Sequence, residues 1–399
     1  MSGQMSLAKT TQKTPYGHVQ YYAALDGFRG LLALFVAIHH ATWFSYLNYR
    51  SFINEGFVII DLFFAFSGFL MFTLYAGKLT DKASCVNFMQ RRFARLYPIH
   101  IFMLAVFVGF AVLRLLAHKA GFAEHEAGEV LPFSAGAAEG WGSVLSHITL
   151  THSMGLHESL TFNYPSWTIS VEFFAYFIFM AMMVWAPPRK TWHFGLIAAG
   201  IAGVYYGLSR VKPDMDITYD LGFFRCLGGF FTGILAAWVH GKLTARRSQK
   251  GAPNLALATF IEIVTVTLSV LFVIYWAGKL QFFVGPVMFA FMVVFASDSG
   301  LVSRFMSLPI FAYLAKISYS VYMIHVIIAI AFAIVGTRLF PDYLIVGDIE
   351  NGLWGDLYNI PYLLVVIACS HLTWKYVEVP GGKFLRKVKW GKSERKDTA

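Results

Sequence analysis

Residues 25–41 read LDGFRGLLALFVAIHHA, an apolar run that contains Asp26, Arg29, His39 and His40. Such a run is typical of a transmembrane helix, which needs about 20 predominantly apolar residues. Ionisable side chains at membrane depth cost enough free energy that they usually have a partner or a function. We therefore interpret this stretch as the first membrane helix and as part of a functional site.

Arg29 and His40 are eleven positions apart, close to three turns of an α-helix. Their side chains are expected on one stripe, separated by a rise of about 16 Å. His39 would be turned about 80° from that stripe, so His40 is the stronger candidate. Structural alternatives exist for both, because Arg29 can extend to the interface and His40 can bond to a polar group on a neighbouring helix.

The composition is that of a polytopic membrane protein, since 57% of the 399 residues are hydrophobic and only 14% are charged. The first 22 residues are polar and contain no apolar core, so no cleavable signal peptide is expected. Cys85, Cys226 and Cys369 are too few and too widely spaced for a disulfide framework or a metal cluster. We expect no metal cofactor.

The apolar runs predict an all-α bundle of about ten transmembrane helices. They occupy residues 25–45, 56–77, 98–117, 167–186, 192–208, 219–239, 254–276, 280–297, 318–337 and 357–376. The stretch 141–157 is less apolar and contains His147, His152 and His157. We interpret it as a re-entrant or interfacial helix on a long loop; if it spans instead, the topology after it inverts.

Loop charge predicts the orientation. With the N-terminus inside, the cytoplasmic segments carry 22 Lys and Arg and the outer segments carry six. The positive-inside rule therefore places both termini in the cytoplasm and residues 118–166 outside. The net charge of +10 then reflects topology and does not indicate a nucleic-acid partner. We expect a polar cytoplasmic segment 1–22, a membrane domain 23–380 and a basic cytoplasmic tail 381–399 that contacts anionic lipid.

On this topology the ionisable residues form two layers. The layer in the outer half contains His40, Asp61, Glu172 and Arg225. The layer at the inner surface contains Arg29, Arg91, Arg92 and Arg95, with His325 and His371 a turn or two further in. Structural alternatives remain, because arginines can anchor a helix at the interface and buried carboxylates can pair with an arginine. A general base in the outer layer and phosphate-binding arginines in the inner layer would suit an enzyme that moves a chemical group from a cytoplasmic donor to an acceptor outside.

Six motifs occur in one order along nearly the whole chain. They are LDGFRG followed by His40, DLFFAFSGFLM at 61–71, RRFARLYP at 91–98, PSWTISVEFFAY at 165–176, ISYSVYMIH at 317–325 and VEVP at 377–380. In this order the chain resembles the acyltransferase-3 family of integral membrane acyltransferases. The resemblance covers a membrane domain without the extracytoplasmic hydrolase-like domain of some members. The GGK that follows Pro380 departs from the aromatic and basic residues more usual in relatives.

The resemblance implies an enzyme of the bacterial inner membrane that moves an acyl group, commonly acetyl, from acetyl-CoA or another acyl-CoA to a hydroxyl of a glycan or similar acceptor. The donor-binding residues would be Arg29, Arg92, Arg95 and His325. The acceptor-binding residues would be Ser170, Trp167 and Arg225.

In this reading His40 acts as the general base or briefly carries the acyl group. Glu172 or Asp61 would orient its imidazole, and Glu172 is preferred because its motif also contains Ser170. The competing function is a transporter or flippase for a sugar or lipid-linked intermediate. Such a protein would be expected to have broken helices and inverted repeats, and neither is evident in the sequence.

Overall fold

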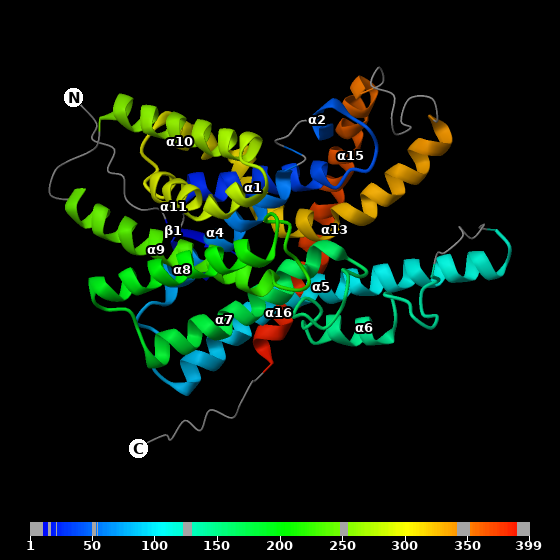
Figure 1. Cartoon of the computed structure of the whole chain (residues 1–399), viewed down its shortest axis with the longest axis horizontal. Coiled ribbons are helices and arrows are strands. Elements are labelled where there is room, and N and C mark those ends of the chain that lie inside the picture. Colours follow the sequence, from blue (N-terminus) through cyan, green and yellow to red (C-terminus); the bar gives the residue numbers. More distant parts are fainter. Residues whose placement is uncertain are drawn as a thin grey trace.

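The structure is a computed structural model in which helices cross one another in a broad bundle (Figure 1). It describes residues 11–14, 17–20, 22–49, 53, 55–122, 130–247, 254–340 and 352–388. Most of the expected N-terminal segment and the end of the basic tail lie outside the described residues. Before the first helix, β1 (Thr11–Thr14) pairs with β2 (Gly17–Gln20) in an antiparallel ribbon.

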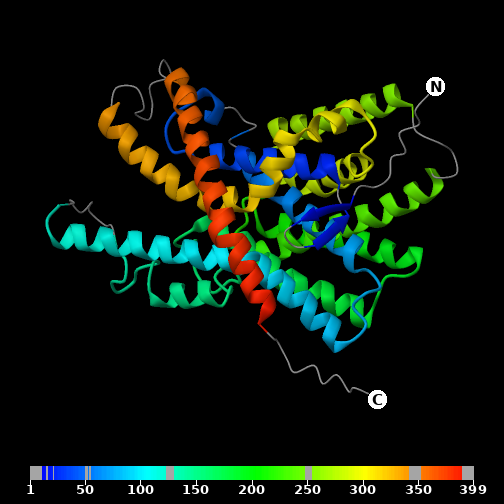
Figure 2. The ribbon, with the colours of Figure 1, turned by 180° about the vertical axis from the view of Figure 1, so that it is seen from behind.

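The rest of the described chain is almost entirely helical. Its α-helices are α1 Ala23–His39, α2 Tyr46–Tyr49, α4 Ile59–Tyr75, α5 Lys82–Lys119, α6 Trp141–Ile148, α7 Trp167–Trp185, α8 Thr191–Val211, α9 Gly222–Arg247, α10 Leu255–Tyr275, α11 Val284–Phe295, α12 Leu301–Met306, α13 Pro309–Leu339, α15 Gly352–Thr373 and α16 Val379–Lys387. Short 3-10 turns are η1 Glu55–Val58, η2 Tyr164–Ser166 and η3 Gly278–Phe283, and the π-helical turn η5 Trp374–Glu378 joins α15 to α16. Figure 2 shows α15 and α16 crossing the back of the bundle as one continuous rod.

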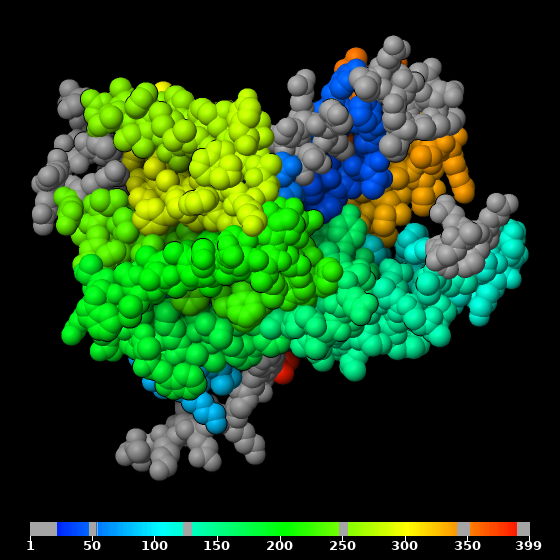
Figure 3. Space-filling model, viewed as in Figure 1, coloured from blue at the N-terminus to red at the C-terminus, as the bar shows by residue number. Residues whose placement is uncertain are grey.

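Nine helical segments within the described residues are long and apolar enough to cross a membrane. These nine segments match nine of the ten predicted spans. The remaining predicted span, the first in the chain, is α1, whose 17 residues are about 25 Å long. Each predicted span coincides with a helix, so the all-α, multi-pass membrane fold is confirmed. In the space-filling view α7 and α8 close one face of the bundle (Figure 3).

Two close helix pairs form the centre of the bundle, α1 with α13 and α4 with α9. Small residues make this approach possible, as is common between membrane helices. A Cβ on Gly30 would overlap the backbone of Ala315, and a Cβ on Gly233 would overlap the backbone of Ala65. The close packing of α1 on α13 determines which residues of α13 face Arg29 and His40.

The helix α5 is longer than the sequence predicted. We expected a span starting at Pro98, but α5 begins at Lys82 and continues through that proline. Its start is set by a capping box in which Asp81 and Ser84 satisfy each other's backbone N–H groups. The segment that carries the inner arginines is therefore helical. α16 packs along it, and Gln90 donates to the carbonyl of Leu385 at 2.8 Å.

The helix α6 has eight residues, about 12 Å, and is too short to cross a bilayer. The segment 141–157 therefore does not span, as predicted. It is held against two membrane helices. Tyr97 of α5 donates to the carbonyl of Ile148 at 3.2 Å, and Ser170 of α7 donates to the carbonyl of Leu150 at 2.6 Å.

Candidate active site

The Arg29 and His40 side chains both face α13. Arg29 Nη2 donates to the carbonyl of Ala315 at 3.3 Å, and His40 Nδ1 lies 3.0 Å from His325 Nε2. His39 points elsewhere, with its Nδ1 2.7 Å from the carbonyl of Ile53. The predicted stripe is confirmed, although α1 ends at His39 and His40 is its C-cap.

The hydrogen bonds define the direction of the His40–His325 contact. His325 Nδ1 lies 3.1 Å from the carbonyl of Val321, which can only accept, so this nitrogen carries the proton. In a neutral ring Nε2 is then an acceptor, and His40 Nδ1 must donate to it. His40 Nδ1 is also 3.0 Å from the carbonyl of Val36. These hydrogen bonds assign the proton of a neutral His40 ring to Nδ1 and leave its lone pair on Nε2.

The structure places His325 beside His40, whereas we expected it near the arginines that we predicted to bind the donor. α13 begins at Pro309 rather than at residue 318, so His325 lies deep within the helix and is fully buried. Tyr164 contributes a third ring, 5.1 Å from that of His40.

A cavity of about 170 Å³ gathers the predicted donor-binding arginines. Arg29 reaches it from α1, and Arg92 and Arg95 reach it from α5. Glu172 of α7 lines the same cavity and accepts a hydrogen bond from Tyr176 at 2.6 Å. Three cations and one carboxylate from three helices therefore share one internal space.

Each arginine is held by a different partner. Arg29 pairs with Asp26 at 2.8 Å, and Arg92 lies over the ring of Tyr75, 5.6 Å from its centroid. Arg95 forms an ion pair with Glu378 of the VEVP motif. Among the described residues, the Nε atoms of Arg29 and Arg92 are buried and have no hydrogen-bond partner. Buried donors without a partner are rare, so these two mark the cavity as a place for an anion.

Glu172 does not contact His40 in the described part of the chain. The contacts of His40 run to His325, Tyr164, His39 and Val36. On α7 the Glu172 side chain faces the arginines of the cavity instead. The ring that hydrogen-bonds to His40 is that of His325.

Asp61 and Arg225 form a fully buried ion pair. Arg225 donates to both Asp61 oxygens, with the Nη2–Oδ2 distance at 2.6 Å, and to the carbonyls of Phe57 and Ile217. The ring of Trp167 lies 5.4 Å from the guanidinium. None of these side chains lines the cavity described above, and neither does Ser170. Their contacts hold helices and loops together, which is the structural alternative that the sequence left open.

Tyr322, which we did not select from the sequence, lies between the cavity and the histidine pair. It lines the cavity, and its ring centroid is 5.9 Å from that of His325. Its hydroxyl donates to the carbonyl of Pro165 at 2.8 Å. The sequence spacing could have identified it, because Tyr322 precedes His325 by three positions and therefore lies on the same helix face.

The start of α1 is anchored from a loop. Asp298 accepts a hydrogen bond from the backbone N–H of Ala24 at 2.9 Å. Burial raises the pKa of Asp298 to about 6, and the backbone hydrogen bonds to Ala24 and Ala23 only partly offset that effect.

Residues 22–375 match a family model described as an acyltransferase domain. The chain belongs to the acyltransferase-3 family. A candidate O-acetyltransferase of Staphylococcus aureus is 21% identical over 93% of this chain, and the match covers 59% of that protein. Protein 2 in the picA locus of Rhizobium radiobacter is 36% identical over 23% of this chain and 46% of its own length.

The acyltransferase MdmB of Streptomyces mycarofaciens is 29% identical over 37% of the chain and 33% of its own length. The chain thus spans about half the length of the first two relatives. No solved structure gives a significant match.

Proposed function

We propose that this acyltransferase-3 family member moves an acyl group, most simply acetyl, from a cytoplasmic acyl-CoA to a hydroxyl of a glycan or similar acceptor on the outer side of a bacterial inner membrane. Both termini are cytoplasmic in this proposal. The observation that carries it is the cavity that gathers Arg29, Arg92 and Arg95 and whose lining residue Tyr322 also contacts the ring of His325, the partner of His40.

The arginines bind the phosphates of the donor. A guanidinium donates two parallel, charge-assisted hydrogen bonds to a phosphate, and the buried Nε atoms of Arg29 and Arg92 are available for them. The cavity is smaller than the 300–1,000 Å³ or so typical of ligand pockets. We therefore place the phosphates at the arginines and the slender thioester arm further in, while the adenosine remains at the cytoplasmic mouth.

His40 acts as the general base. Its Nε2 takes the proton of the acceptor hydroxyl as that oxygen attacks the thioester carbonyl, the carbon–sulfur bond breaks, and the thiolate leaves and is protonated to free CoA. His325 positions the ring by accepting from Nδ1 and so keeps the lone pair on Nε2. An acyl-His40 intermediate uses the same nitrogen and the same leaving group.

The other predicted site residues take revised roles. Glu172 contributes a carboxylate beside the arginines, where with Tyr176 it orders the donor cavity. Asp61, Arg225, Trp167 and Ser170 stabilise the helices and the re-entrant loop around the site. The names of the relatives support an oxygen acceptor and an acetyl donor.

The test is transfer of label from radioactive acetyl-CoA to extracted surface glycan by the purified protein in lipid nanodiscs. Label in the glycan, dependent on the protein and proportional to its amount, supports the proposal. Binding of acetyl-CoA without transfer or hydrolysis, across a panel of glycan acceptors, would contradict it. Transport of a sugar or lipid-linked intermediate without acylation would favour the flippase.

A further inference from the structure

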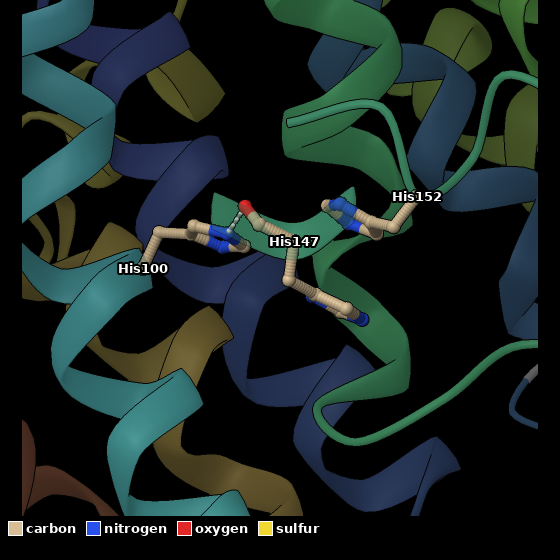
Figure 4. Close-up of side chains that lie close together, drawn as sticks. All are labelled: His100, His147 and His152. Carbon is tan, nitrogen blue, oxygen red and sulfur yellow. Dashed lines mark hydrogen bonds between the residues drawn. The ribbon is translucent and has the colours of Figure 1, made fainter. Parts of the chain in front are cut away.

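Three histidines outside the proposed acyl-transfer site come together where the segment 141–157 meets α5. His100 belongs to α5, His147 to α6, and His152 to the loop that follows α6 (Figure 4). All three are buried, with exposed fractions of 1%, 2% and 5%. Their ring nitrogens include one from each residue that lie within 4.8 Å of one another.

Hydrogen bonds to the backbone indicate the tautomers of two of these rings. His100 Nε2 lies 2.9 Å from the carbonyl of His147, and His152 Nε2 lies 3.1 Å from the carbonyl of Ser166. Because carbonyls only accept, His100 Nε2 carries the proton. His152 Nε2 also lies 3.2 Å from the Ser166 hydroxyl, which can accept as well, and we assign its proton to this nitrogen; in a neutral ring each Nδ1 then holds a bare lone pair. Both Nδ1 atoms are buried and have no hydrogen-bond partner in the described part of the chain.

Two unpaired lone pairs within one buried cluster favour a ligand at these rings. Buried polar atoms are nearly always satisfied, because leaving one without a partner costs on the order of 1–3 kcal/mol. Neutral imidazoles that bond through one nitrogen to a backbone carbonyl and present the other are the usual state of histidine ligands around a metal. The third ring, His147, bonds to Thr161 through Nε2 at 3.1 Å.

We propose that His100, His147 and His152 bind a divalent zinc-type cation. Imidazole ligands suit zinc, copper and nickel, and zinc accepts three histidines with a fourth position left to water. Zinc–nitrogen bonds of about 2.0–2.1 Å place ligand nitrogens roughly 3.4 Å apart, so the rings close around the ion by side-chain rotation. The nearly parallel rings of His147 and His152, 3.8 Å between centroids, separate in this step.

In this proposal the ion ties the segment 141–157 to the membrane bundle. It links α5 to the segment 147–152, which Ser170 also holds through the carbonyl of Leu150. Ser166, the carbonyl partner of His152, ends the η2 turn that begins with Tyr164, whose ring is beside His40. The site is separate from the donor cavity and does not depend on the proposed acyl transfer.

The experiment measures metal binding by the purified chain after cleavage of any histidine tag and removal of metal with a chelator. Zinc chloride is titrated in, bound zinc is counted by mass spectrometry, and cobalt substitution is followed by visible absorption. We expect about one zinc per chain, a cobalt spectrum typical of tetrahedral coordination, and a rise in Tm on adding zinc.

Three variants test the ligands. His100→Gln and His152→Gln should each lower bound zinc at least tenfold and abolish the rise in Tm. His193→Gln removes a histidine from α8 and should bind as the parent does; His193 accepts from the backbone N–H of Arg189 and lies far along the chain from the cluster. If the folded parent chain binds no zinc, nickel or copper at micromolar concentration, or if His100→Gln binds as much as His193→Gln, the proposal is wrong. The titration of the parent chain decides the matter even if a variant fails to fold.

Discussion

His40 Nδ1 lies 3.0 Å from His325 Nε2, and the carbonyl of Val321 makes His325 the acceptor in that hydrogen bond. Two histidines 285 positions apart thus act as one unit, in which a buried ring orients a partly exposed one. In the proposed mechanism His325 is therefore a positioning residue.

Replacing His325 separates that role from donor binding. His325→Leu removes the acceptor, so we expect kcat to fall at least tenfold with donor KM unchanged, because the base is no longer held in its tautomer. His325→Gln keeps an acceptor oxygen and should recover part of the rate. Steady-state kinetics with varied acyl-CoA provide the measurement. A rise in donor KM with kcat intact would return His325 to the donor site.

Arg92 provides the cleanest test of the donor site. Arg92→Gln should raise donor KM by about 10- to 100-fold, which corresponds to roughly 1.5–3 kcal/mol for a lost charge-assisted contact. Arg91→Gln is the matched control, since Arg91 bonds to Asn87 at 2.7 Å and does not line the cavity. Equal donor KM in the two variants would leave these arginines with a topological role alone. Arg95 is less suitable, because its loss strands the buried Glu378.

Asp61 should behave as a structural residue. Asp61→Asn leaves the Arg225 guanidinium buried without its counter-charge, and such a loss costs about 3–5 kcal/mol. We expect a large fall in Tm, measured in detergent, that the double variant Asp61→Asn with Arg225→Gln partly reverses. An Asp61→Asn protein with the parent Tm and no transfer would instead make Asp61 a catalytic residue.

The raised pKa of Asp298 predicts that the folding stability of the protein depends on pH. Its folded-state pKa of about 6 exceeds the ordinary value of 3.8, so the folded chain binds the proton more tightly than the unfolded chain. Ionisation of Asp298 therefore lowers the free energy of unfolding. This loss is absent below about pH 4, grows as the pH rises toward about 6, and is constant at higher pH. Asp298→Asn keeps the acceptor for Ala24 and cannot ionise. Its Tm should exceed that of the parent at pH 8 and equal it at pH 4; equal values at both pH values would contradict the raised pKa.

Hydropathy and helical periodicity were sufficient for much of the fold. The spans follow from apolar length, and the common face of Arg29 and His40 follows from 3.6 residues per turn. The limits of the helices were less predictable. The capping box at Asp81 starts α5 well before the apolar run, and α13 likewise begins at Pro309 in a segment with polar residues.

The partners of the site residues could not be predicted, because depth along the membrane normal does not determine which way a side chain faces around its helix. Glu172 was placed level with His40 but faces the arginines, and His325 was placed inward but meets His40. The three-histidine cluster was missed for a related reason. His100 is separated from His147 by a long stretch that no metal-binding spacing anticipates.

The most direct test of the central claim is the transfer rate of His40→Ala beside His39→Ala, in protein shown by Tm and acetyl-CoA binding to be folded. His39 bonds to the carbonyl of Ile53 and makes no hydrogen bond to His325 among the described residues, so its loss should leave substantial activity. His40→Ala should bind acetyl-CoA and transfer no acyl group. A folded His40→Ala protein with a near-normal transfer rate, or an equal loss in His39→Ala, would contradict the account.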